Sequence, residues 1–270
     1  MKLIVVNESD IRDAVSMSEA IAAVKDAFAR LSSGKAIVPL RSRIPAAESE
    51  GTTLIMPAYL EGAGSLSVKV VSVFPHNAEK GLPTIHAIVM VVDAETGKPL
   101  ALMAGESITA LRTGAASGAA TDLLVRRDAH TAAIIGTGVQ GRTQLQAVCE
   151  VREIRRVFVF NPHRDKAEAF AAEMEKRGKV PGDIVVASSA SEAISEADII
   201  CTATTSRTPL FRNSDLKPGA HINGVGSYRP DMQEVDELTV AQSKFVVDSL
   251  TACLSEAVDI IIPRKKGLIS

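Results

Sequence analysis

The chain has 270 residues, a hydrophobic fraction of 46% and a formal net charge of −2. A length above the commonest single-domain size predicts two domains in one chain, each with its own core. With seven Phe, two Tyr, no Trp and no excess of positive charge, the composition excludes a stacking platform or a basic field for nucleic acid.

The N-terminus and the cysteines indicate a cytoplasmic protein. The first residues turn polar too early for a signal peptide, and no apolar run approaches the ~20 residues that a membrane span needs. Cys149, Cys201 and Cys253 lie far apart without metal-ligand spacing, and their odd number suits reduced thiols inside a cell. We therefore expect a cytoplasmic location and no membrane partner.

The first predicted element is an amphipathic helix. Ser16 and Glu19 have the spacing of a capping box, and Gly34 offers a C-terminal stop. Apolar residues recur at helical intervals between them, namely Ile21, Val24, Phe28 and Leu31. From Ile37 to about Ala101 the pattern changes to short extended runs, at 53–56, 66–74 and 86–92, separated by Pro and Gly. These runs predict a small mixed sheet domain with the helix against it.

Residues 107–125 predict a helix rich in Ala, Gly, Ser and Thr that can approach its neighbours closely. It ends at a charged segment, so we place the domain boundary there, with domains at 1–125 and 126–270. Beyond it, apolar strands alternate with helices: strands at 132–135, 157–160, 184–186, 199–201, 222–223 and 245–247, and helices at 139–150, around 167–174 and near 191–195. This alternation predicts an α/β fold, a Rossmann-type doubly wound parallel sheet.

A GxGxxG run joins the strand at 132–135 to the helix that follows, as a dinucleotide-binding turn requires. The run is Gly136, Thr137, Gly138, Val139, Gln140 and Gly141. Gly136 permits a tight turn, Gly138 lets a pyrophosphate approach bare backbone, and Gly141 allows the helix to pack on the strand. The helix N-terminus adds unpaired N–H donors for the phosphates.

The end of the next strand bears on which dinucleotide binds. Asn161 stands where a carboxylate would accept hydrogen bonds from the adenosine ribose and repel a 2′-phosphate. Arg164 could pair with that phosphate. The pattern favours NADP(H), and NAD(H) remains the alternative, with Arg164 then a solvated residue of the first helical turn.

Cations stand at two positions where apolar or small neighbours cannot neutralise them. Lys69 lies within an apolar strand, where burial is costly unless the ammonium is partnered or deprotonated. It is either an edge-strand lysine that reaches water or a functional lysine. Arg112 lies among small residues and suits a bidentate carboxylate ligand. His86 and His221 lack neighbours at metal-ligand spacing, so we expect no metal site.

Taken together, these residues resemble the ornithine cyclodeaminase and mu-crystallin family. The resemblance covers nearly the whole chain and is carried by five segments: Met56-Pro57-Ala58, Lys80-Gly81-Leu82-Pro83-Thr84, Leu111-Arg112-Thr113-Gly114-Ala115-Ala116, the GTGVQG turn and Asn223-Gly224-Val225-Gly226. It implies a Rossmann domain plus a dimer-forming substrate domain, and hence a homodimer. The family includes cyclodeaminases, alanine dehydrogenases, cyclic ketimine reductases and crystallins.

The resemblance also implies roles for individual residues. Arg41 and Arg112 would hold the substrate carboxylate, with Lys69 beside the reacting carbon and nitrogen. Two guanidiniums would then orient an α-imino or α-amino acid while a hydride is exchanged at its α-carbon, and Lys69 would protonate the nitrogen or polarise the carboxylate. Further positions are placed with the cofactor, namely Thr113, Thr202, Val225 and Gly226.

Two departures from the family pattern refine the expected activity. Tyr228 aligns with an aspartate proposed to act on the amine of ornithine, and Asp231, three residues further on, is the alternative carboxylate for that role. We therefore expect reduction of a cyclic α-imino acid of the pyrroline-2-carboxylate type, with ornithine cyclodeaminase or alanine dehydrogenase as the alternatives. The second departure is that the family's closing C-terminal segment is missing after Ser270. Either the chain is a truncated form or its pocket is completed otherwise, for example by a partner subunit, and a non-catalytic, crystallin-like NADPH binder is a further alternative.

Overall fold

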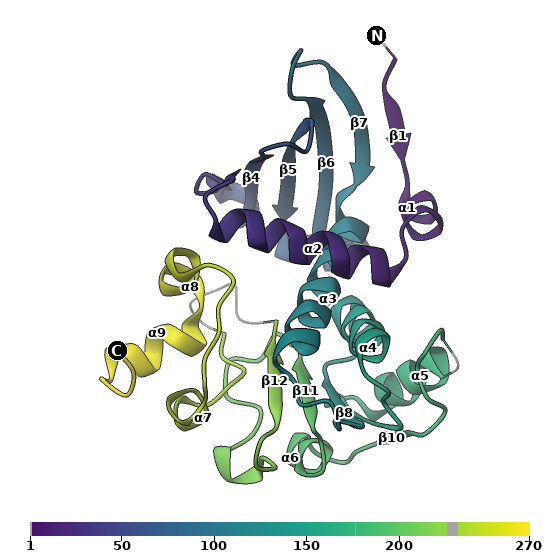
Figure 1. The fold of residues 1–270 in the computed structure, drawn as a ribbon, viewed down its shortest axis with the longest axis vertical. Helices are drawn as coiled ribbons and strands as arrows, with labels where there is room; N and C mark the ends of the chain where they lie inside the picture. Colours follow the sequence, from purple (N-terminus) through teal and green to yellow (C-terminus); the bar gives the residue numbers. More distant parts are fainter. Residues whose placement is uncertain (1, 176, 226–231) are drawn as a thin grey trace. The chain divides into compact units, whose positions relative to one another are not determined.

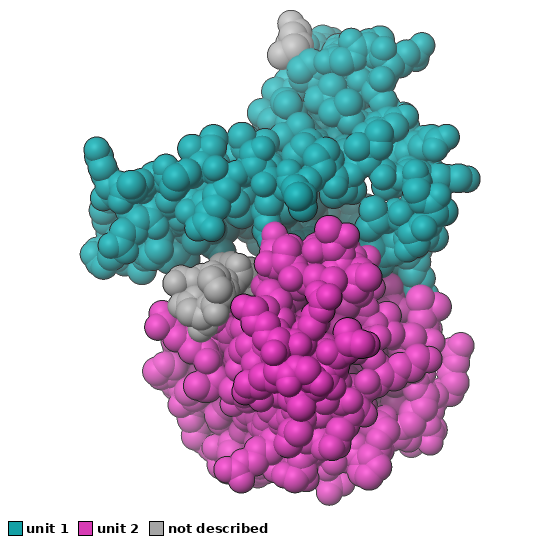
Figure 2. All heavy atoms as spheres, turned by 90° about the vertical axis from the view of Figure 1, so that its left-hand side faces the viewer, with its two compact units in different colours: residues 1–112 teal, residues 113–270 magenta. Residues whose placement is uncertain are grey.

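A computed structural model describes residues 2–175, 177–225 and 232–270 of the chain. Two compact units make up the chain, residues 1–112 and residues 113–270 (Figure 2). The division falls within one helix, α3 (Gly105–Leu124), whereas the expected boundary of 125 lies at the end of the same helix. No helix in the described ranges is long and apolar enough to cross a bilayer.

Unit 1 is built on a seven-stranded mixed sheet in the order β1-β7-β6-β5-β4-β2, with β3 paired to β4. The strands are β1 (Ile4–Val6), β2 (Ala36–Ile37), β3 (Ser42–Ala46), β4 (Gly51–Leu60), β5 (Ser65–Val73), β6 (Ile85–Asp93) and β7 (Pro99–Ala104). Neighbouring strands are antiparallel except β1, which runs parallel to β7. The short elements of this unit are α1 (Glu8–Ala14), η1 (Ala47–Ser49) and η2 (Pro75–Lys80).

Helix α2 (Met17–Ser32) runs across the strands of this sheet in Figure 1. Its capping box is present: the Ser16 hydroxyl accepts a hydrogen bond from the Glu19 N–H, and the Glu19 carboxylate accepts one from the Ser16 N–H at 2.9 Å. The chain turns away at Gly34, where φ is +75°. The predicted helix and the mixed sheet are therefore confirmed.

Unit 2 contains a five-stranded, all-parallel sheet in the order β10-β9-β8-β11-β12. The strands are β8 (Thr131–Ile135), β9 (Arg156–Phe160), β10 (Ile184–Val186), β11 (Ile199–Thr202) and β12 (His221–Gly224). The helical elements are α4 (Val139–Val151), α5 (Arg164–Met174), α6 (Ala190–Ser195), η3 (Asn213–Asp215), α7 (Glu237–Gln242), α8 (Leu250–Glu256) and α9 (Val258–Lys265). Figure 1 labels the α-helices among them. The predicted doubly wound α/β fold is confirmed.

Alternation along β8 divides the core of unit 2 between the two faces of its sheet. Ala132 and Ile134 join a buried cluster with Phe170 of α5, whereas Ala133 and Ile135 join a second cluster with residues of α6. Successive side chains of a strand point to opposite faces, so a strand covered on both sides is apolar throughout. Burial on both faces holds the central strand β8 in position, and the glycine turn begins directly after this strand.

The strand predicted at 245–247 is wrong. In the structure this segment is not part of either sheet, and Phe245 and Val246 are about half exposed. A short apolar run indicates a strand only when a neighbouring edge is available to pair with it, and the run itself cannot show that edge.

Candidate functional site

Lys69 lies on an inner strand of the sheet of unit 1. It is in register with Met56 on β4 and Val89 on β6, so the edge-strand alternative for this lysine is wrong. Burial, followed by the positive charges of Arg112 and Arg41, lowers the pKa of Lys69 to about 8. The structure therefore brings the three predicted substrate-binding cations of unit 1 within electrostatic reach of one another.

Arg41 is itself partly buried, just before β3. Burial and the neighbouring positive charge of Arg43 lower the pKa of the Arg41 guanidinium. Like charges that converge in a partly buried place destabilise each other, and an anion placed among them offsets that cost. A carboxylate is a fitting anion because a guanidinium presents two parallel N–H donors to its oxygens.

The glycine turn joins β8 to α4 at the point where the strand order of the parallel sheet reverses. In open α/β sheets ligands bind at this switch point, outside the carboxyl ends of the strands. Gly136 has φ +101°, and a Cβ there would lie 2.3 Å from the Ala203 carbonyl oxygen. A Cβ on Gly141 would lie 2.2 Å from the Gly136 carbonyl oxygen. Both positions therefore exclude a side chain.

Gly138 differs from the two glycines around it, since a Cβ there would meet nothing within 4 Å. The backbone at Gly138 faces open space, as a backbone that receives a pyrophosphate must. Within the described part of the chain, Gln140 Oε1 is buried in the same turn without a hydrogen-bond partner, while Val139 is exposed. An open backbone cradle and an unsatisfied acceptor fit a dinucleotide with donor groups.

Asn161 and Arg164 follow β9, next to the turn. Asn161 Nδ2 donates to the Thr137 hydroxyl at 2.7 Å, and its Oδ1 accepts from the His163 N–H at 2.9 Å. Arg164 is exposed, and its Nε donates to Glu168 at 2.8 Å. Asn161 therefore links the turn to the next loop, and Arg164 is paired along its own helix.

Of the other described residues that were predicted to bind the cofactor, Thr113 lies on α3, Thr202 on β11 and Val225 directly after β12. Thr202 ends β11, is buried, and accepts the Val225 N–H through its carbonyl at 3.0 Å. Thr113, on α3, accepts a hydrogen bond from Gln144 Nε2 of α4 at 3.3 Å through its carbonyl. Helices α3 and α4 pack closely there, since a Cβ on Gly114 would lie 2.6 Å from the Thr143 carbonyl oxygen.

Three positions used in the sequence argument, Gly226, Tyr228 and Asp231, lie outside the described residues. In the ranges that are described, no group of three or more His, Cys, Asp or Glu side chains comes together as a metal site. His221 is mostly buried and makes a hydrogen bond of 3.0 Å with Asn223 Oδ1 through its Nε2. Burial is the main cause that lowers the pKa of His221.

Two residues of the turn's surroundings were missed by the sequence reasoning. Glu234 is fully buried and accepts the Thr204 N–H at 2.6 Å and the Thr202 hydroxyl at 3.1 Å, so it holds the loop that contacts Gly136. Arg142 donates to two carbonyls of the turn from α4. Their partners are remote in sequence or on the backbone, and no residue pattern signals either contact.

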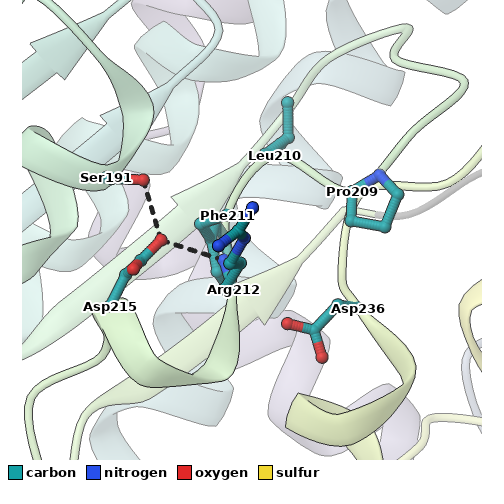
Figure 3. A pocket seen from close by; sticks show the side chains of 7 residues that line it. All are labelled: Ser191, Pro209, Leu210, Phe211, Arg212, Asp215 and Asp236. Carbon is teal, nitrogen blue, oxygen red and sulfur yellow. Dashed lines mark hydrogen bonds between the residues drawn. The ribbon is translucent and has the colours of Figure 1, made fainter.

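A separate hollow of about 550 Å³ lies on unit 2 (Figure 3). It is lined by Ser191, Pro209, Leu210, Phe211, Arg212, Asp215 and Asp236. Asp215 accepts hydrogen bonds from the Ser191 hydroxyl at 2.7 Å and from the Arg212 N–H at 3.0 Å. None of the predicted site residues lines this hollow, so it is distinct from the glycine turn.

Comparison with known proteins identifies the family to which this chain, with its cation cluster of Lys69, Arg41 and Arg112 and its glycine turn, is similar. The model of the ornithine cyclodeaminase/mu-crystallin family matches residues 1–262. The chain belongs to this family. A family relative from Bacillus cereus, a Delta(1)-pyrroline-2-carboxylate reductase, is 43% identical over 267 residues, which are 98% of this chain and 81% of the relative. The resemblance inferred from the sequence is therefore confirmed.

Two solved structures of family members share the fold along almost the entire chain. Delta(1)-pyrroline-2-carboxylate reductase from Thermococcus litoralis, in complex with NADH and L-proline, has a TM-score of 0.93 and 47% identity, covering 99% of this chain and 82% of that one. An archaeal alanine dehydrogenase dimer with bound NAD has a TM-score of 0.90 and 34% identity, covering 100% of this chain and 81% of that one.

Proposed function

We propose that this chain is an NAD(P)H-dependent reductase that converts pyrroline-2-carboxylate to proline. The observation that carries the proposal is the relative of this activity that is 43% identical over 98% of the chain. The Thermococcus litoralis structure with NADH and L-proline supports the same substrate class. The cations of unit 1 suit the carboxylate that pyrroline-2-carboxylate and proline share.

The site residues divide the chemistry between them. Arg41 and Arg112 bind the substrate carboxylate and thereby fix the orientation of the carbon–nitrogen double bond. A reduced nicotinamide, when bound, supplies the hydride that the α-carbon accepts. Lys69 holds a proton at Nζ with a pKa of about 8 and delivers it to the ring nitrogen, so the double bond becomes a carbon–nitrogen single bond.

We propose that the dinucleotide is held by the turn at 136–141 together with Thr113, Thr202, Val225 and Gly226. For the adenosine ribose the finer proposal is a preference for NADP(H), because Asn161 brings no carboxylate to repel a 2′-phosphate. The exposed Arg164 would leave its ion pair with Glu168 and bind that phosphate instead. The two solved relatives hold NADH and NAD, and they lend this preference no support.

An Arg164→Ala variant tests the cofactor preference. We expect it to weaken NADPH binding and to leave NADH binding unchanged, because only NADPH carries the phosphate. Tighter binding of NADH than of NADPH by the wild type would reject the preference. Equal losses for both cofactors in the variant would show that Arg164 acts on the turn and not on the phosphate.

We propose a functional division in which residues 1–125 bind the substrate and form a homodimer, while residues 126–270, together with Thr113, bind the dinucleotide. Unit 1 exposes apolar side chains of the kind that dimers bury, including Val38 and Leu40. The archaeal alanine dehydrogenase of the same fold is a dimer.

The activity is tested by mixing purified protein with NADH or NADPH and following the loss of nicotinamide absorbance. We expect turnover with pyrroline-2-carboxylate and weaker turnover with piperideine-2-carboxylate. Alanine dehydrogenase is the second candidate, favoured by the 34% identical archaeal structure, and pyruvate with ammonia would reveal it. Ammonia release from ornithine would instead identify a cyclodeaminase. Cofactor binding without turnover of any of these substrates would overturn the proposal.

Arg41→Ala and Arg43→Ala form a matched pair for the substrate site. Arg43 is exposed, and its guanidinium reaches Thr52 at 3.4 Å. We expect Arg41→Ala to raise the KM for the imino acid by about tenfold or more, since it removes a charge-assisted hydrogen bond to a carboxylate. Arg43→Ala should stay within about twofold of the wild type, as exposed substitutions usually do.

A further inference from the structure

We propose that Arg142, braced by Glu173, is a positioning residue that sets the orientation of the phosphate-binding amides in the glycine turn. The inference rests on the proposed dinucleotide site and deepens it. Arg142 is the fourth residue of α4, and its Nη1 donates to the carbonyl oxygens of Thr137 at 2.7 Å and Gly138 at 3.0 Å, while its backbone N–H also donates to the Gly138 carbonyl at 3.4 Å. It therefore contacts the two central peptide groups of the turn.

Because of the geometry of the peptide group, these two contacts determine the direction in which the N–H groups of Gly138 and Val139 point. A peptide group is planar and trans, so its N–H points opposite to its C=O. The Thr137 carbonyl shares a peptide with the Gly138 N–H, and the Gly138 carbonyl shares one with the Val139 N–H. When both carbonyls are drawn toward Arg142, both N–H groups point the other way.

Those two N–H groups are the donors that an anion would use. Helix α4 begins at Val139, and the N–H groups of a first helical turn have no intrahelical acceptor. The backbone at Gly138 faces open space. Donors that converge on an open region at a helix N-terminus bind phosphate groups, and two fixed peptide planes keep them in that arrangement before the ligand arrives.

Arg142 can hold the carbonyls because its own guanidinium is held by Glu173 and packs against Phe170. Its Nε and Nη2 donate to both oxygens of Glu173 on α5, at distances of 2.5 to 3.1 Å. The guanidinium carbon lies 5.4 Å from the centre of the buried Phe170 ring. The hydrogen bond from Arg142 lowers the pKa of Glu173, so this carboxylate stays ionised. Glu173 also meets Arg177 at 3.3 Å.

The pairing indicates that Arg142 acts by geometry and not by net charge. The charges of Arg142 and Glu173 cancel at short range, so a phosphate beyond the turn meets a nearly neutral pair. A lysine at 142 would keep the charge but has a single nitrogen, which cannot serve both carbonyls and both carboxylate oxygens as the planar fork does.

The experiment measures cofactor binding without substrate. Wild type, Arg142→Ala and Arg142→Lys are titrated with NADH by fluorescence and with ADP-ribose by calorimetry. Arg156→Ala is the matched control, because Arg156 forms an arginine–carboxylate pair with Asp183 at 2.7 Å elsewhere on unit 2. We expect Arg142→Ala to raise the Kd of both ligands by about tenfold. Arg142→Lys should recover less than half of the lost affinity, and the control should keep both Kd values within about twofold of the wild type.

Steady-state kinetics and a double variant separate positioning from other roles. For Arg142→Ala we expect a higher KM for NADH, with kcat at saturating NADH and the KM for the imino acid unchanged within about twofold. The Arg142→Ala/Glu173→Ala variant leaves the net charge unchanged and should bind NADH as weakly as Arg142→Ala. Glu173→Gln should give a smaller loss, because the carbonyl contacts remain while the brace weakens.

The possible results distinguish this inference from the proposed activity. Wild-type Kd values in Arg142→Ala, or recovery of binding in the double variant, would overturn the positioning role. Loss of folded protein in Arg142→Ala with normal NADH affinity in a well-folded Arg142→Lys would also overturn it. If the wild type binds NADH and turns over none of the tested substrates, the proposed function fails, whereas a loss of ADP-ribose binding in Arg142→Ala still supports the inference.

Discussion

Deprotonation of Lys69 is expected to set the alkaline limit of imine reduction. Burial, and then the charges of Arg112 and Arg41, lower the pKa of Lys69 from 10.5 to about 8. With this value the ammonium form falls from about 90% at pH 7 to about 10% at pH 9, whereas an ordinary lysine would stay about 97% protonated at pH 9. In the proposed mechanism this ammonium supplies the proton for the ring nitrogen, so we expect activity to decrease as the pH rises through about 8.

The assay is the pH profile of kcat/KM for pyrroline-2-carboxylate at saturating NADH. We expect a decrease of about tenfold between pH 7 and pH 9 for the wild type. The Lys69→Arg side chain stays positively charged throughout this range and is a poor proton donor, so kcat/KM should be about a hundredfold lower. Its pH profile should lack the decrease near pH 8 that belongs to Lys69. The substrate nitrogen titrates equally with both enzymes, and the difference between the two profiles therefore isolates the side chain.

Two results would refute this reasoning. A wild-type profile without an ionisation near pH 8 would remove the role of the lowered pKa, and an identical limb in Lys69→Arg would assign the ionisation to another group. Acetylation of Lys69 followed by mass spectrometry gives its pKa without substrate. In Arg112→Met this pKa should rise, because a positive neighbour is gone.

Three further predictions concern the turn, the sheet of unit 2 and the dimer. Gly138→Ala should leave the melting temperature unchanged and raise the Kd of NADH by about tenfold or more, whereas Gly141→Ala should lower both stability and affinity, because its Cβ would lie 2.2 Å from the Gly136 carbonyl oxygen. Asp198→Ala should lower the free energy of unfolding in urea by about 1–3 kcal/mol, because this buried carboxylate pairs with two partly exposed cations and accepts the backbone N–H groups of His130 and Thr131. Leu40→Glu, at a position that is 77% exposed in the single chain, should convert the proposed dimer to a monomer in light scattering.

Each of these has a contradicting outcome. A drop in melting temperature for Gly138→Ala would show that the open space at this position is filled by the fold itself. An unfolding free energy within about 0.5 kcal/mol of wild type for Asp198→Ala would show that its ion pairs are solvated. A dimer that persists in Leu40→Glu would place the interface on another surface.

Local patterns were sufficient for most of the fold. The capping box at Ser16, the alternation of strands and helices after residue 131 and the glycine turn each combine a short-range signal with a fixed structural outcome. The run at 245–247 failed because strand formation depends on a partner edge that lies elsewhere in the chain. The sequence likewise left open whether Lys69 lies on an inner or an edge strand, since the order of strands in a sheet cannot be predicted from the residues of a single strand.

For the candidate site, the sequence could indicate residues whose type is unusual in its context, and no more. Lys69 and Arg112 stand out as cations among apolar or small neighbours. Arg142 does not stand out, because a charged residue on an amphipathic helix is ordinary. Its partner Glu173 is 31 positions away and on another helix. The role of such a residue exists only in the folded chain.

The contrast among the three glycines of the turn has an evolutionary consequence. Gly136 and Gly141 are required by the fold itself, because a side chain at either would collide with backbone. Gly138 meets no such obstacle, so the proposed dinucleotide is the constraint that we expect at this position. A descendant that stopped using the dinucleotide could keep its fold and its first and last glycines while position 138 drifted. Variation at this one position would therefore record whether a lineage still binds a nucleotide, independently of any assay of turnover.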